Sequence, residues 1–208
     1  MLRPFTRVWL ALALLGLLLP ATSRAGDSTT FLIKKGNHYD TNYLVGLRAL
    51  QVKTRVDRTV SFRGYFYDNA AYTTSNPQNQ SDWNKLMGIT TNLIHKNSIR
   101  LGWSWRPPRA GDPNSGKMAL GFYGYIRGQR ISQEITRVPL RTWFDCVLRM
   151  HNGGLSVKVN GIEVKRDQSL GFSSVIPTMT WMLQTAYFGG DETAPHDINI
   201  RVEGIVAR

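Results

Sequence analysis

The chain has 208 residues, of which 42% are hydrophobic and 19% are charged. These proportions supply a hydrophobic core and exclude collagen-like, coiled-coil and generally disordered chains. The only cysteine, Cys146, excludes a disulfide scaffold. The 26 basic and 14 acidic side chains give a net charge of +12. A chain of this length fits one globular domain.

The first 25 residues have the pattern of a secretory signal peptide. Basic residues precede an apolar run, Leu10–Leu19, and small residues follow up to Ala25. An apolar run of about 10 residues is too short for a membrane-spanning helix, which needs about 20. We therefore expect residues 1–25 to be removed and residues 26–208 to form a single domain without a transmembrane segment. The mature protein would then be secreted or periplasmic.

The basic charge stays with the mature domain. Removal of Arg3, Arg7 and Arg24 would lower the 26 basic side chains to 23, against 14 acidic ones, a net charge of +9. The electric field of such a charge attracts polyanions, including acidic polysaccharides. The alternative is that the charge only keeps the protein soluble. Nucleic acid is not favoured as a partner, because the Lys and Arg residues are dispersed and no reader motif is present.

Taken in chain order, the predicted elements begin with a turn-rich loop at 68–80 and a short strand at 85–90. The stretch 98–106 alternates strictly, which predicts a strand with one apolar face and one polar face. Its polar face carries Arg100, Ser104 and Arg106. A second turn-rich loop follows at 107–116, and we expect both loops to lie at one rim of a sheet.

The next run places three apolar residues on one face and Tyr123, Tyr125 and Arg127 on the other. The stretch 143–150 is apolar on both faces, which predicts a central strand. Two further runs are joined by Asn160-Gly161, a strong hairpin signal, and a last strand is expected at 196–202. About ten short strands without crossover helices indicate an all-β, antiparallel two-sheet β-sandwich, a jelly roll.

A resemblance supports this fold over roughly the last third of the mature chain. In Trp143–Gly161, a strand opened by Trp and a small turn lead to a strand that ends in Val-Asn-Gly. The turn Phe188-Gly189-Gly190 then leads into the last strand. This pattern resembles the jelly rolls of the concanavalin A-like lectin/glucanase and laminin-G-like superfamily. The resemblance implies a concave face that often holds sugar, but one such fold hosts many functions.

The polar faces of two strands form the first candidate site. Guanidinium groups bind carboxylates or sulfates, and aromatic rings stack on sugars. The segment Trp83–Lys85 adds an indole, an amide and an ammonium group, although we favour a structural role for it, in which these side chains satisfy backbone groups of a loop and the Trp fills the core. The predicted ligand-binding residues are Arg100, Arg106, Tyr123, Tyr125, Arg127, Trp83, Asn84 and Lys85. Our main hypothesis is a secreted, lectin-like module that binds an acidic polysaccharide without catalysis; an ordinary solvated sheet face is the alternative.

Two other functions stay open. The segment Gly121–Gln129 is similar to the tyrosine-bearing strand of jelly-roll alginate lyases, although the chain lacks that family's Gln-Ile-His and Arg-x-Glu-x-Arg motifs. This resemblance implies a lyase acting on a uronic-acid polymer, with Tyr123, Tyr125, His95 and His196 as acid–base candidates. The third possibility is an envelope or matrix protein-contact module. A glycoside hydrolase is disfavoured because no pair of carboxylates is suitably spaced.

An acidic loop near the end of the chain is the candidate metal site. Asp191, Glu192 and Asp197 offer oxygen ligands for Ca²⁺, although their spacing matches no strict calcium motif. We favour a solvated loop in which these carboxylates pair with Arg or with turn amides. The thiol of Cys146 is expected to be buried and not nucleophilic.

Overall fold

The structure is a computed structural model that describes residues 28–41, 51–53, 58–90, 96–171 and 179–207. The predicted signal peptide and His95 lie outside the described residues. Within these ranges, no helix is both long and apolar enough to cross a membrane.

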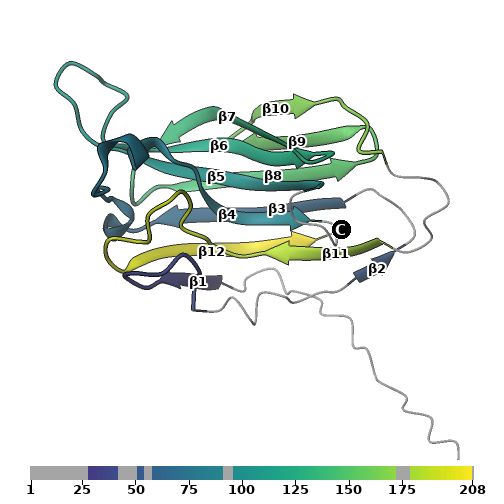
Figure 1. The fold of residues 1–208 in the computed structure, drawn as a ribbon, viewed down its shortest axis with the longest axis horizontal. Coiled ribbons are helices and arrows are strands. Elements are labelled where there is room, and N and C mark those ends of the chain that lie inside the picture. The colour runs from purple at the N-terminus through teal and green to yellow at the C-terminus, as the bar shows by residue number, and fades with distance from the viewer. Residues whose placement is uncertain (1–27, 42–50, 54–57, 91–95, 172–178, 208) are drawn as a thin grey trace, which may run out of the picture.

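The described residues form two antiparallel six-stranded sheets (Figure 1). The first sheet has the order β1 (Ser28–Ile33), β12 (Ile198–Ala207), β3 (Arg58–Phe66), β8 (Trp143–His151), β9 (Gly154–Val159) and β10 (Ile162–Arg166). The second has the order β2 (Gln51–Lys53), β11 (Met179–Gln184), β4 (Asn84–Thr90), β5 (Ser98–Arg106), β6 (Lys117–Ile126) and β7 (Gln129–Val138). The predicted jelly-roll β-sandwich is confirmed.

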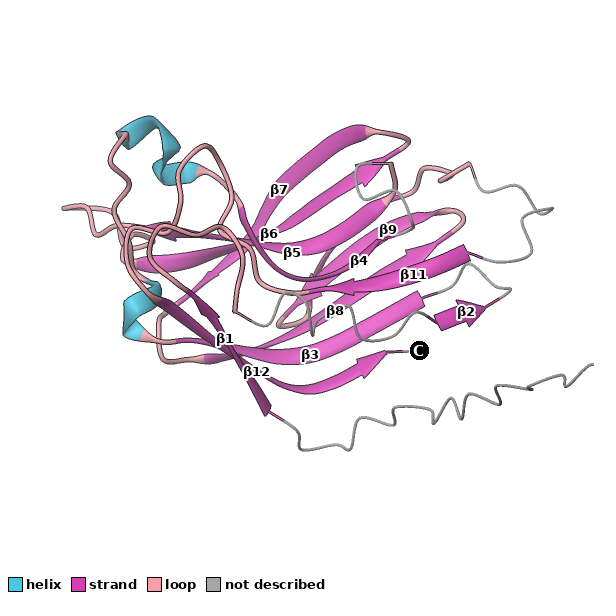
Figure 2. Cartoon of the chain, turned by 60° about the horizontal axis from the view of Figure 1, so that its bottom comes forward, coloured by secondary structure: helices cyan, strands magenta, loops and turns pink. Residues whose placement is uncertain are grey.

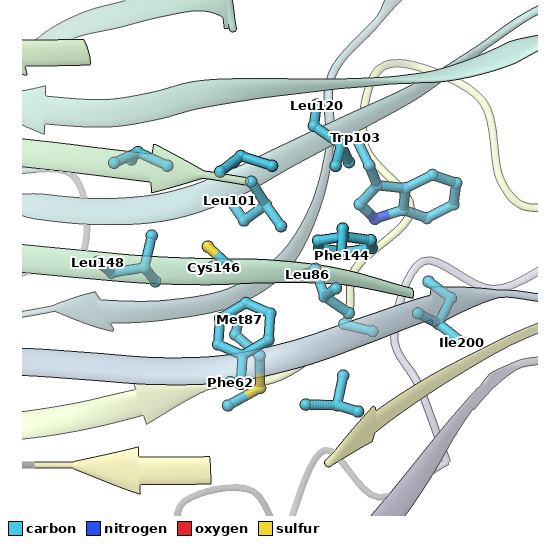
Figure 3. Packing of buried hydrophobic residues seen from close by; sticks show 14 of the residues in the cluster. Phe62, Leu86, Met87, Leu101, Trp103, Leu120, Phe144, Cys146, Leu148 and Ile200 are labelled. Atoms are coloured by element: carbon cyan, nitrogen blue, oxygen red, sulfur yellow. The ribbon is translucent and has the colours of Figure 1, made fainter. Parts of the chain in front are cut away.

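The core lies between the two sheets and is built by the alternation of each strand (Figure 3). The apolar face of β5 carries Trp103, which is fully buried against Phe66 of the opposite sheet, with ring centroids 5.5 Å apart. Phe144 of β8 stacks on the same phenylalanine at 5.6 Å. Burial of such large apolar side chains is the main force that holds the sheets together, at about 25 cal/mol per Å² of apolar surface.

Strand β8 occupies the inner position that its sequence predicted, between β3 and β9. The prediction that it is buried on both faces is wrong, because Asp145 and Arg149 are exposed. The outer face of this sheet carries no further layer of described residues. Trp143 is instead partly covered by Arg63, whose guanidinium carbon lies 5.0 Å from the centroid of the Trp143 ring.

Long loops gather at one end of the sandwich (Figure 2). They include the 3₁₀-helices η1 (Asp68–Ala70) and η2 (Pro77–Ser81) and the loop 107–116 between β5 and β6. This confirms the prediction that the two turn-rich stretches share one rim. The loop 107–116 closes on its strands through a hydrogen bond from the backbone N–H of Gly116 to the carbonyl of Arg106, 2.7 Å.

Candidate functional site

Two irregularities in strand pairing shape the outer face of the second sheet, the face turned away from the core. Between β4 and β5, Lys85 pairs with Gly102 and Gly88 pairs with Arg100, so three steps on β4 oppose two on β5. A β-bulge of this kind redirects side chains, and bulges are common beside active sites. Here it places both Lys85 and Gly88 on the outer face, which regular alternation forbids.

Glycines on this face make room for two functional side chains. The ring of Trp83 lies over Gly102 and Gly121, where an added Cβ would come within 2.9 and 2.5 Å of it. Gly88 leaves space for the side chain of Arg100 in the same way, since a Cβ there would lie 2.3 Å from the Arg100 Cγ. Trp83 therefore lies on the outer face, as a sugar-binding role requires, and does not fill the core.

Lys85 is held between two tyrosine rings. Its Nζ lies 4.6 Å from the centroid of the Tyr123 ring and 5.2 Å from that of Tyr187. The backbones of Lys85 and Tyr187 exchange two hydrogen bonds of 2.8 Å, which fixes both side chains on the same face. Gly189 passes beside the ammonium group, where a Cβ would lie 2.4 Å from Nζ.

This environment makes Lys85 an unusual lysine. Burial lowers its pKa, assisted by the positive charges of Arg100 and Arg130 and opposed by Asp82, and together they bring it from 10.5 to about 8. Burial disfavours the charged form of an amine, and neighbouring cations do the same. A substantial share of Lys85 is therefore neutral near pH 8 and able to accept a proton.

Tyr123 shows the opposite perturbation. Burial raises its pKa to about 12, assisted by the neighbouring Tyr125, whereas Arg130 lowers it. The two tyrosine hydroxyls are 3.5 Å apart. Tyr123 therefore keeps its proton under conditions in which Lys85 loses one, and the pair offers an acid and a base on one surface.

Arg100 lies beside this pair, directly opposite Tyr123 in the β5–β6 ladder. Its guanidinium donates to the backbone carbonyls of Thr185 and, at 3.5 Å, Leu86. These bonds hold the positive charge in place. Lys85, Arg100, Tyr123, Arg130 and Tyr187 are together called the Lys85 site below.

A second group of charges lies on the same face, near the loop 107–116. Glu134 accepts from Arg106 at 3.3 Å and from Arg137 at 2.7 Å. A second bulge, on β7, places Glu134 and Arg137 on this face together. Lys117 is opposite Arg106 in the ladder. These four residues are called the Arg106 cluster below.

Two of the predicted ligand-binding residues are placed differently from the rest. Asn84 is buried: it donates to the Tyr72 hydroxyl at 2.9 Å and accepts from the Gly189 backbone at 2.7 Å. Arg127 follows the end of β6 and has a φ of 51° in the turn to β7, so it leaves the face of Tyr123 and Tyr125. The buried side chain of Asn84 is not available to a ligand on the outer face, and we correct that assignment. Arg127 is exposed, and its assignment stays a prediction.

The predicted histidine bases also differ from expectation. The Nε2 of His196 lies 3.0 Å from the carbonyl oxygen of Asn69 in η1, which packs on β12 of the first sheet. This places His196 with the other sheet, away from the outer face that carries the tyrosines. His95 is outside the described residues.

The three carboxylates of the predicted calcium site are not brought together. Glu192 accepts from the backbone of Ser75 and Asn76 at 2.8 and 2.9 Å, and these bonds lower its pKa. Asp197 binds Lys34 Nζ at 2.8 Å, which lowers its pKa too. Asp191 is exposed. Within the described ranges, no three potential ligand residues are grouped for a metal ion.

Comparison with known proteins adds a fold relationship. No family model and no curated protein matches the chain. Solved structures do: the alginate lyase Aly36B has a TM-score of 0.61 at 10% identity, covering 87% of this chain and 80% of that one. The chain shares a jelly-roll fold with alginate lyases. The lyase from Klebsiella pneumoniae gives a TM-score of 0.56 at 15% identity, covering 74% of this chain and 60% of the other.

A third structure agrees, an alginate lyase from Pseudomonas aeruginosa with a TM-score of 0.52, 11% identity, and coverage of 74% of this chain and 65% of that one. The chain thus spans less than two thirds of the Pseudomonas and Klebsiella enzymes. These neighbours support the predicted jelly-roll fold. They overturn our preference for a protein without catalytic activity, because the similar structures are those of alginate lyases.

Sequence reasoning found part of this site and missed part of it. Arg100, Tyr123, Tyr125, Lys85 and Trp83 do lie on one face, with Arg106 farther along it. Arg130 and Tyr187 were not predicted. The alternation of 129–138 would have indicated Arg130, but the approach of Tyr187 to Lys85 depends on a long-range pairing.

Proposed function

We propose that the protein is a polysaccharide lyase that cleaves a uronic-acid polymer by β-elimination. The observation that carries the proposal is the position of Lys85 Nζ, 4.6 Å from the centroid of the Tyr123 ring, in surroundings that lower the pKa of Lys85 to about 8 and raise that of Tyr123 to about 12. The fold neighbours act as support: a variant of Aly36B was solved in complex with an alginate trisaccharide. Alginate is therefore the first substrate to test.

The reaction requires three groups, and the Lys85 site supplies each. A cation first offsets the charge of the uronate carboxylate, which makes the neighbouring C5 proton more acidic; Arg100 and Arg130 are placed for this. Neutral Lys85 then removes that proton as general base. The electron pair forms a double bond between C4 and C5, and the C4–O bond breaks.

Tyr123 completes the step as general acid. It donates its proton to the departing oxygen, so that one chain becomes two, one of them ending in an unsaturated uronate. Solvent then restores the proton of Tyr123 and removes that of Lys85. The distance of 4.6 Å between Lys85 Nζ and the Tyr123 ring lets both groups reach one sugar unit.

The proposal includes export from the cytoplasm, for which the pattern of residues 1–25 is the support. A polymer of uronic acid is a large polyanion outside cells, and the basic charge of the mature domain would attract it.

The test is an absorbance assay on purified protein. Alginate, pectate and hyaluronan are incubated separately, and the unsaturated product is followed at about 235 nm, where the new conjugated double bond formed by base-catalysed elimination absorbs. We expect activity on at least one polyuronate and none on a neutral glucan. Absence of product on all polyuronates would refute the proposal.

Lys85→Arg is the decisive variant, because arginine keeps the positive charge but does not give up its proton. We expect its rate to fall by about 10²–10⁴-fold, the usual contribution of a general base. Lys158→Arg is the matched control, since Lys158 is exposed on β9 of the other sheet. If both variants kept full activity, Lys85 would not be the base.

A further inference from the structure

A cavity of about 250 Å³ opens at the end of the outer face next to the loop 107–116. Its wall includes Arg106 and Arg137 of the Arg106 cluster, together with Arg109 from the loop. The acidic residues of the same wall are Glu134 and Asp112. Three guanidinium groups therefore face two carboxylates, and the cavity has an excess of positive charge.

The pairing of Arg106 with Lys117 points to an anionic ligand. Two like charges directly opposite each other in an antiparallel ladder are destabilising. Glu134 offsets only part of this charge, since it is shared between Arg106 and Arg137. Within the described part of the chain, the ammonium group of Lys117 has no hydrogen bond or ion pair.

The guanidinium groups also retain unused donors. Arg106 donates to Ser104 and Glu134, and Arg137 donates to Glu134 and the carbonyl of Asn114. Each guanidinium has five N–H groups, so both keep donors for a further acceptor. A carboxylate or sulfate is the acceptor that this geometry binds best.

Trp83 lies between this cavity and the Lys85 site. Its ring covers Gly102 and Gly121, which lie between Arg100 and Arg106 along β5 and between Tyr123 and Lys117 along β6. The guanidinium carbon of Arg106 is 5.6 Å from the centroid of the Trp83 ring, so the two side chains form one continuous surface. A flat indole suits the apolar face of a sugar ring.

We propose that the cavity is a distal anion subsite, and that the substrate chain runs along β5 and β6 from the Lys85 site, over Trp83, to Arg106 and Lys117. This inference rests on the proposed function and specifies the direction in which the polymer lies. Arg100 and Arg106 are six residues apart on one strand, which corresponds to about 20 Å. Only a substrate chain long enough to span that distance would bind more tightly because of the cavity.

The experiment compares a size series of uronic-acid oligomers, from trimer to octamer, as substrates of the wild type and of the Arg106→Gln/Lys117→Gln double variant. We expect the wild type to show a lower KM for long oligomers than for the trimer, by about tenfold, and the double variant to lose this preference. Arg109→Gln, in the exposed loop, should lose part of it without disturbing the Glu134 ion pairs. The control is Arg149→Gln/Lys158→Gln on the other sheet, which should keep the preference.

A preference for long chains that survived in the double variant, or its absence in the wild type, would overturn the subsite. A binding assay keeps this result separate from the lyase proposal. Electrophoresis of each protein through a gel containing polyuronate measures retention without any cleavage. If the Arg106→Gln/Lys117→Gln protein loses retention while the wild type and the control variant keep it, the subsite is supported even if no product forms. Equal retention of all the proteins, or no retention of the wild type, overturns it.

Discussion

Replacement of Lys85 by methionine is expected to raise thermal stability while it removes the lyase activity proposed above. Burial and the charge of Arg100 lower the pKa of Lys85 from 10.5 to about 8 in the folded protein. The charged amine is therefore less favourable in the folded than in the unfolded state. This cost is complete below pH 8, where both states carry the proton, and it fades as the pH rises to 10.5.

The size of the gain follows from the same values. The difference between 10.5 and about 8 corresponds to at most about 3 kcal/mol. The partial exposure of Lys85 lowers this figure, and the variant loses two cation–π contacts worth about 0.5–1 kcal/mol each. A net gain of up to about 1 kcal/mol remains, which raises Tm by up to about 4 °C for a domain of this size.

Thermal melts at pH 7 and pH 10.5 measure this effect. The Lys85→Met protein should melt above the wild type at pH 7, and the difference should shrink at pH 10.5. Lys158→Met, an exposed position on β9, should show no such gain at either pH. A variant that melts below the wild type at pH 7, or whose gain is the same at both values, would refute the reasoning.

Four further predictions concern the site and its supports. The value of kcat/KM should rise about tenfold per pH unit up to pH 8 as Lys85 loses its proton, then level off, in a profile measured from pH 6 to 10. Tyr123→Phe should lower kcat by about 10²-fold or more in steady-state assays, with a smaller effect on KM. Gly121→Ala should lower the free energy of unfolding in urea by about 1–3 kcal/mol, because its Cβ would lie 2.5 Å from Trp83. Glu192→Gln should melt below the wild type at pH 7 and converge with it at acidic pH, because a carboxyl group whose pKa is lowered by folding stabilises the folded protein only while it is ionised. Neither EDTA nor calcium should shift the melting temperature of either protein.

Alternation along single strands was sufficient to predict much of the outer face. It placed Arg100 on one polar face and Tyr123 with Tyr125 on another, and the ladder brings Arg100 and Tyr123 directly opposite each other. The same alternation predicted an apolar face for 98–106, and Trp103 of that face is fully buried in the core. These predictions succeed because the side-chain period of a strand is two wherever the pairing is regular.

The rest of the site depends on departures from that period. The bulge in β4 puts Lys85 and Gly88 on one face although they are three residues apart, and the bulge in β7 does the same for Glu134 and Arg137. A bulge has no fixed residue signature, so its position follows only from the paired strand. Tyr187 depends on the same kind of long-range information, because it meets Lys85 through a bridge between distant segments.

Some polar residues that the sequence suggested as ligand-binding groups are instead bonded to the protein's own backbone. Asn84 and Glu192 have the chemistry of ligand-binding groups, but their oxygens accept hydrogen bonds from the backbone N–H groups of loops. Buried or constrained backbone donors must find a partner, and in a sandwich with long loops at one rim the nearest partners are such side chains. Local sequence shows which groups are able to bind, and only the fold shows which are already engaged.

The Lys85 site is also a place where the protein accepts a local cost. A partly buried amine next to Arg100 is unfavourable below its pKa, and it persists because its neighbours hold it in place. Its backbone is fixed by two hydrogen bonds to Tyr187, and the core beneath it is closed by fully buried residues such as Leu86. A base needs a pKa near the working pH, and only a position that is fixed and partly dry provides this for a lysine. The same features that destabilise Lys85 are therefore those that suit it to remove a proton.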